Sequence, residues 1–177
     1  MDNTLPAYIE HLELIAFFSG YPFLYFFTWF IAGEGRKKQF TYTKLLVKLL
    51  PFSYALTATL YMGMVLNEII GNSEDVGFSA LFHYPFLKIW GLLAVLFWFP
   101  FLNKRPVNSL LHSLLFFYLL LKDIYLYLVV STNSSLIKND MRMYTDSILL
   151  NAVTLGITFS AYLAWTFFTG NKKNNSP

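Results

Sequence analysis

The hydrophobic residues of this chain come in five long runs, which are separated by short polar segments. The runs cover approximately residues 12–32, 45–70, 80–102, 107–130 and 148–168. At about 1.5 Å per residue, a helix formed by each run is long enough to cross a hydrocarbon core of roughly 30 Å. The pattern therefore predicts an all-α integral membrane protein, with five transmembrane helices in a single membrane domain over residues 1–177.

Details within and between the runs refine the predicted helices. Pro22 lies near the middle of the first run and predicts a kink there, because proline lacks a backbone N–H and clashes with the preceding turn. The third run has an ambiguous start, which lies at Tyr84 or as early as Phe78. The polar segment before the fifth run predicts a short interfacial helix at about 136–144.

Composition supports the membrane assignment. The chain is 56% hydrophobic and only 13% charged, whereas a typical soluble domain carries about 25% charged residues. Mean hydropathy is +0.49 and the formal net charge is +3. The basic residues gather near the ends of the hydrophobic runs rather than in one patch, which favours a lipid bilayer over nucleic acid as the partner. We expect a multi-pass protein of the plasma (inner) membrane.

The charges between the runs predict the orientation of the helices. Basic residues follow the first and third runs and the fifth, whereas the segment after the second run is acidic at Glu74 and Asp75. Because basic loops stay in the cytoplasm, this alternation places the N-terminus outside and the C-terminus in the cytoplasm. The residues predicted to bind lipid head groups are Arg36, Lys37, Lys38, Lys104 and Arg105.

The fourth run carries two adjacent charges, Lys122 and Asp123, well inside its apolar sequence. A charge within the hydrocarbon core costs about 2.5 kcal/mol or more, so such residues usually have a partner or a function. Neighbouring residues point about 100° apart around a helix and do not face each other. Each charge therefore needs its own partner. Within the helix, Tyr118 or Tyr125 can serve Lys122, and Tyr127 can serve Asp123. Between helices, the combinations left open are Lys122 with Glu68, Asp123 with Lys88, and Lys88 with Glu68.

These charges predict a polar layer in the outer half of the membrane. One interpretation is a pocket or a proton or ion path that opens outward, and the other is a set of structural contacts that fixes the helix register. The residues predicted to line the ligand or ion pathway are Glu68, Lys88, Lys122, Asp123 and Asn151.

Two stripes of small residues predict where helices pack. The stripes recur every four residues, which places each of them on one helix face and lets helix backbones approach closely in lipid. We expect the second and fifth helices to pack through them. Their members are Ala55, Thr59 and Gly63 in the second helix, and Ala152, Gly156, Ser160 and Ala164 in the fifth.

Motifs for catalysis or metal binding are missing from the sequence. It contains no G-x-S-x-G, H-E-x-x-H or P-loop motif, and its three histidines do not share a helix face. We therefore expect no catalytic residue, metal or cofactor, and a binding or assembly role rather than an enzymatic one. The leading hypothesis is a small transport-like or ligand-binding membrane module. Alternatives are a non-catalytic sensor or scaffold subunit of a larger complex and, more weakly, a lipid-modifying enzyme. So few helices enclose a solute path poorly, which favours a homo-oligomer or a partner membrane subunit.

Overall fold

A computed structural model describes four stretches of the chain, residues 5–32, 41–71, 85–130 and 134–173. Within these stretches the structure is helical, without strands. Four helices there are long and apolar enough to cross a membrane, which indicates a multi-pass membrane protein. They cover Tyr8–Ile31, Leu45–Gly71, Pro106–Leu126 and Met141–Thr169.

The first spanning helix is broken into two parts, α1 (Leu5–Phe18) and α2 (Tyr21–Ala32). Pro22 lies in the first turn of α2, where the missing N–H of proline is tolerated. Ser19 still donates its backbone N–H to the carbonyl of Ile15, at 3.1 Å. The kink predicted near Pro22 is thus a break in the helix at Ser19 and Gly20.

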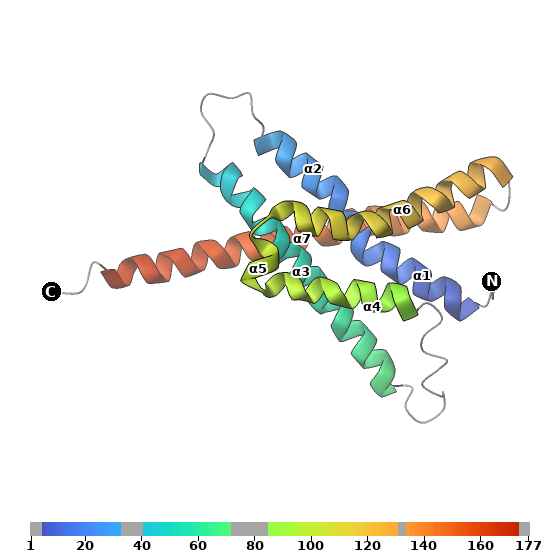
Figure 1. The fold of residues 1–177 in the computed structure, drawn as a ribbon, viewed down its shortest axis with the longest axis horizontal. Coiled ribbons are helices and arrows are strands. Elements are labelled where there is room, and N and C mark those ends of the chain that lie inside the picture. Colours follow the sequence, from blue (N-terminus) through green and yellow to red (C-terminus); the bar gives the residue numbers. More distant parts are fainter. Residues whose placement is uncertain (1–4, 33–40, 72–84, 131–133, 174–177) are drawn as a thin grey trace.

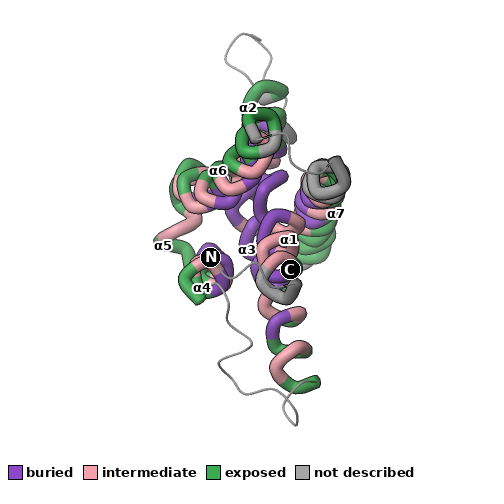
Figure 2. Tube along the Cα trace, turned by 90° about the vertical axis from the view of Figure 1, so that its right-hand side faces the viewer, coloured by how far each residue is buried: buried purple, intermediate pink, exposed green. Residues whose placement is uncertain are grey.

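Helix α3 (Thr41–Gly71) runs through the middle of the bundle (Figure 1). Burial is concentrated along it and along the helices packed on it (Figure 2). The aromatic rings of Tyr54 and Tyr61 on this helix are buried, and both pack edge-on against Phe18 at the end of α1. Phe18 in turn stacks on Phe116, with 4.6 Å between ring centroids. An aromatic core therefore joins the broken helix to α3 and to the helix that carries Phe116.

The third hydrophobic run folds as three short pieces, α4 (Pro85–Leu93), the 3₁₀ helix η2 (Ala94–Trp98) and α5 (Pro100–Asn103). Phe99 separates η2 from α5 and is extended, with φ −76° and ψ 134°, as expected for a residue that precedes a proline. Together α4 and η2 are about 24 Å long, less than a hydrocarbon core. The predicted residues 80–84 of this run lie outside the described part of the chain.

The last two helices are α6 (Pro106–Val130) and α7 (Ser134–Lys173). The 40 residues of α7 make a helix about 60 Å long, which merges the predicted interfacial helix with the fifth hydrophobic run. The C-terminal half of α7 extends beyond the other helices (Figure 1) and exposes Trp165, Phe167 and Phe168.

Helices α3 and α7 do pack together, but through different residues from those predicted. The stripe Ala152, Gly156, Ser160 and Ala164 is exposed along α7, and nothing lies within 4 Å of a Cβ added at Gly156 or Gly63. The contact is made by polar side chains instead, with the hydroxyls of Thr57 and Thr154 3.1 Å apart. The small residues of α7 would allow another helix to approach closely on their face. The opposite face of α7 packs against α3 instead, because polar side chains buried in a bundle need hydrogen-bond partners.

Candidate functional site

A buried lysine lies among carboxyl groups at one end of the bundle. Lys88 of α4 is only 4% exposed. Its Nζ lies 3.6 Å from Oε2 of Glu68 on α3 and 3.8 Å from Oε1 of Glu10 on α1. The beginnings of α1 and α4 and the C-terminal end of α3 meet at this end of the molecule (Figure 1). The structure therefore brings Glu68 and Lys88 together, one of the pairings that the sequence left open.

A third carboxyl group belongs to the same cluster. Glu13 interacts electrostatically with Glu68, Lys88 and Glu10. Ionised carboxylates repel one another and are attracted by an ammonium group, so these four side chains influence one another's charge. Glu10, Glu13, Glu68 and Lys88 are called the acidic cluster below.

Glu10 and Glu13 are not among the predicted pathway residues, and they lie where the first hydrophobic run begins. A carboxylate at that position is normally explained by contact with head groups and water. Their spacing of three residues was the available signal, because it places both side chains on one face of α1. The structure turns that face toward α3 and α4, and Glu10 is 4% exposed.

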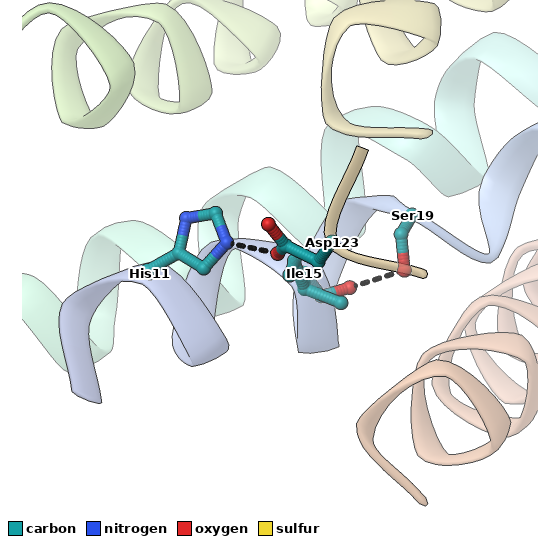
Figure 3. A network of polar contacts seen from close by, with 4 residues as sticks. All are labelled: His11, Ile15, Ser19 and Asp123. Carbon is teal, nitrogen blue, oxygen red and sulfur yellow. Dashed lines mark hydrogen bonds and ion pairs between the residues drawn. The ribbon is translucent and has the colours of Figure 1, made fainter. Parts of the chain in front are cut away.

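Asp123 belongs to a different contact, at the interface of α1 and α6. Its Oδ2 lies 2.5 Å from Nε2 of His11 (Figure 3). The two side chains are 18% and 23% exposed, for His11 and Asp123 respectively. The proposed pairing of Asp123 with Lys88 is therefore wrong, because α1 lies between them in the packing and supplies a nearer partner to each.

Lys122 points away from both contacts. Its side chain is exposed, and it forms no ion pair with any residue that the structure describes. The turn of about 100° between neighbouring positions directs Lys122 outward when Asp123 faces α1. The prediction that Lys122 lines a pocket or pairs with Glu68 is wrong.

Asn151 lies in a third group of polar contacts, at the break between α1 and α2. It is 1% exposed, and its Nδ2 donates to the carbonyls of Phe17, at 2.9 Å, and Ser147, at 2.8 Å. The backbone N–H of Gly20 donates to Oγ of Ser147, at 2.9 Å. Asn151 thus supplies a hydrogen bond at the helix break and does not line the acidic cluster.

A partly buried histidine lies deeper in the bundle. Nδ1 of His112 is 2.8 Å from the hydroxyl of Tyr54, and the imidazole stacks on Trp90 with 4.7 Å between centroids. Nε2 of His112 and the hydroxyl of Tyr61 are buried without a hydrogen-bond partner among the described residues. This pairing could not be predicted from the sequence, because Tyr54 and His112 are far apart along the chain.

The other predicted residues lie elsewhere. Lys104 and Arg105 are exposed at the turn between α5 and α6, where contact with lipid head groups is sterically possible. Arg36, Lys37 and Lys38 lie outside the described residues. Within the described ranges, no group of histidine and acidic side chains is arranged to hold a metal ion.

Comparison with protein-family models, with curated proteins and with solved structures finds no match to this chain. The interpretation of the site therefore rests on its own geometry and chemistry.

Proposed function

We propose that this chain is a small transport-like or ligand-binding membrane module, and that the acidic cluster is its site. The observation that carries the proposal is the ratio of charges around Lys88. Three carboxyl groups, Glu10, Glu13 and Glu68, surround this single buried ammonium group within the described chain.

The charge ratio also indicates the class of ligand. A charge that is removed from water needs an opposite charge or a proton close by. Lys88 can neutralise one carboxylate of the three. The remaining negative charge favours a small cation or a proton, and it disfavours an anionic ligand.

The proposed topology gives this site access to one side of the membrane. We propose five crossings, in which α4, η2 and α5 together form the short third one. The exposed turn with Lys104 and Arg105 lies at the opposite end of the bundle from the N-terminus (Figure 1). By the positive-inside rule the N-terminus is then outside, the C-terminus is cytoplasmic, and the acidic cluster opens outward from the plasma membrane.

Thermal unfolding of the purified full chain in detergent tests this proposal. The midpoint temperature is measured across pH 5 to 9, and with sodium, potassium or ethylammonium chloride at constant ionic strength. We expect the wild type to respond to pH or to one of the cations, and Glu13→Gln and Glu68→Gln to flatten that response. Asp146→Asn, which alters an exposed carboxylate of α7, is the matched control and keeps the wild-type response. A response that survives in Glu68→Gln would contradict the proposal.

A second candidate function is that of a non-catalytic subunit in a larger membrane assembly. It is supported by the C-terminal half of α7, which exposes Trp165, Phe167 and Phe168 and a face open at Gly156. Small residues on an exposed membrane helix are suited to contact with another helix. Native mass spectrometry of the protein released from mild detergent separates a homo-oligomer or complex from a monomer, and Gly156→Leu would dissociate an assembly formed through this face.

A further inference from the structure

The geometry points to a proton path that leads from the acidic cluster past Tyr61 to the hydrogen-bonded pair of Tyr54 and His112, with Phe18 as its barrier. This inference rests on the proposed function and narrows its ligand to the proton. It concerns groups that lie deeper in the bundle than the cluster itself.

One face of α3 carries the first part of the path. Tyr54, Tyr61 and Glu68 follow one another at intervals of seven residues, so two helical turns, or about 10 Å, separate successive members. The Tyr61 hydroxyl interacts electrostatically with Glu10, Glu13 and Glu68. It is also buried without a hydrogen-bond partner among the described residues. A phenol can accept a proton from one neighbour and donate to another, so Tyr61 is suited to receive a proton from the cluster.

Phe18 separates Tyr61 from Tyr54. Its ring is fully buried and makes edge contacts with both tyrosines, at centroid distances of 5.3 Å and 5.8 Å. The backbone of α4 also packs closely against Phe18 and Tyr61. A Cβ added at Gly91 would lie 3.0 Å from Phe18 and 3.2 Å from Tyr61. Phe18 is the last residue of α1, directly before the break, so a small change at the break would move this ring.

His112 receives the proton beyond the barrier. Its Nδ1 bonds to the Tyr54 hydroxyl, and its Nε2 is the other buried atom without a partner among the described residues. An imidazole can take a proton on one nitrogen and release one from the other. The side chains in ring contact with it are those of Tyr54, Trp90, Phe97 and Phe116, and none of them carries a charge.

Tyr21 and Ser109 continue the path toward the opposite end of the bundle. The ring of Tyr21 lies 4.4 Å from that of Tyr54, between centroids. Its hydroxyl is 2.7 Å from Oγ of Ser109, which donates to the carbonyl of Pro106 at the start of α6. This turn adjoins exposed Lys104 and Arg105, so the polar groups extend to the proposed cytoplasmic end.

Transfer along these groups requires no covalent change other than the exchange of O–H and N–H bonds. A proton leaves a carboxyl group of the cluster, passes through Tyr61 to the Tyr54–His112 pair, and exits by way of Tyr21. Intervals of about 10 Å exceed a hydrogen bond, so water must bridge them during transfer. The two buried atoms without partners are the places where such water would bind.

Proton flux into liposomes tests the path. The full chain is reconstituted into vesicles of phosphatidylcholine and phosphatidylglycerol that contain a pH-sensitive dye, and a pH gradient is imposed with potassium and valinomycin to balance charge. We expect wild-type vesicles to acidify faster than protein-free ones. Tyr61→Phe and His112→Phe should slow this flux by about tenfold or more, because each removes a proton-transfer group. Phe18→Ala should increase it, because the barrier is removed.

Matched variants separate the path from general damage to the protein. Tyr118→Phe and Phe101→Ala alter exposed residues and should leave the flux unchanged. His112→Gln serves as a second variant if His112→Phe does not elute as a folded species. Wild-type vesicles that acidify no faster than protein-free ones would overturn the path. So would wild-type flux in folded Tyr61→Phe and His112 variants.

The outcomes also distinguish this inference from the proposed function. If Glu68→Gln loses its response to cations or pH while the His112 variants conduct normally, the site stands and the path is wrong. If Glu68→Gln keeps the wild-type thermal response, the proposed function itself fails, whatever the flux.

Discussion

The ammonium group of Lys88 lies 3.6 Å from Oε2 of Glu68 and joins the first turns of α4 to the C-terminal end of α3. Replacing Lys88 by glutamine leaves buried Glu10 and partly exposed Glu68 without their shared cation. We expect Lys88→Gln to lower the free energy of unfolding by about 3 kcal/mol. Equilibrium unfolding in mixed micelles measures this loss. Lys122→Gln, at an exposed lysine, should change stability by less than about 0.5 kcal/mol.

The interaction energy between Lys88 and Glu68 can be measured with a double-mutant cycle. In the double variant Lys88→Gln with Glu68→Gln, no charge from this pair remains to be neutralised. Its loss of stability should therefore be smaller than the sum of the two single losses, by about 1 kcal/mol or more. Additive losses would show that Lys88 and Glu68 do not interact in the folded protein.

The contact between His11 and Asp123 predicts that the two adjacent charges of α6 behave differently. Asp123→Asn removes the charge that faces His11 of α1, and it should cost about 1 kcal/mol because the pair is partly exposed. Lys122→Gln is the natural comparison, since it lies one position away. Equal effects of the two substitutions on the unfolding free energy would contradict the assigned orientation of α6.

The amide of Asn151 predicts a structural role at the helix break. Asn151→Leu removes the donor to the Phe17 carbonyl, and a buried acceptor without a partner costs about 1–3 kcal/mol. Asn67→Leu alters an exposed asparagine of α3 and should be nearly neutral. Hydrogen exchange of the α1–α2 region is the second measurement, and it should rise only in the Asn151 variant.

Gly20 lies directly against the backbone of α7. A Cβ at this position would lie 2.4 Å from the backbone nitrogen of Ile148, which cannot move independently of its helix. Gly20→Ala should therefore cost about 3 kcal/mol, at the upper end for an overpacked site. Gly156→Ala adds the same methyl group to open space and should not lower stability. A thermal unfolding midpoint unchanged by Gly20→Ala would show that α2 and α7 are farther apart.

The residues of the acidic cluster show how far the sequence could lead. The pairing of Glu68 with Lys88 was predictable as one of several, because both lie near the same expected membrane edge. Glu10 and Glu13 were missed because a carboxylate at the beginning of an apolar run is expected to contact lipid head groups and water, and so needs no protein partner. Their spacing predicts that they share one face of α1. It does not predict that this face packs against α3 and α4.

The prediction that α7 packs through its stripe of small residues was wrong for a related reason. Ala152 and Gly156 share a helix face suited to close packing, and the structure leaves that face exposed. Asn151 and Thr154, on the opposite face, make the buried hydrogen bonds to other helices instead. Two faces of one helix were both plausible contacts, and only hydrogen bonds between distant parts of the chain decided between them.

The sequence by itself determined the class of this protein, the approximate extent of its helices and the need of its intramembrane charges for partners. These are local properties, since helix length and apolar composition are set within each run. The tertiary structure decided which helix face points inward, where the first helix breaks, and which residue meets each charge. In lipid the outward faces are as apolar as the core, so hydrophobic periodicity does not mark the buried side of a helix. The buried side is set by polar contacts between residues far apart in the chain, as between Lys88 and Glu10.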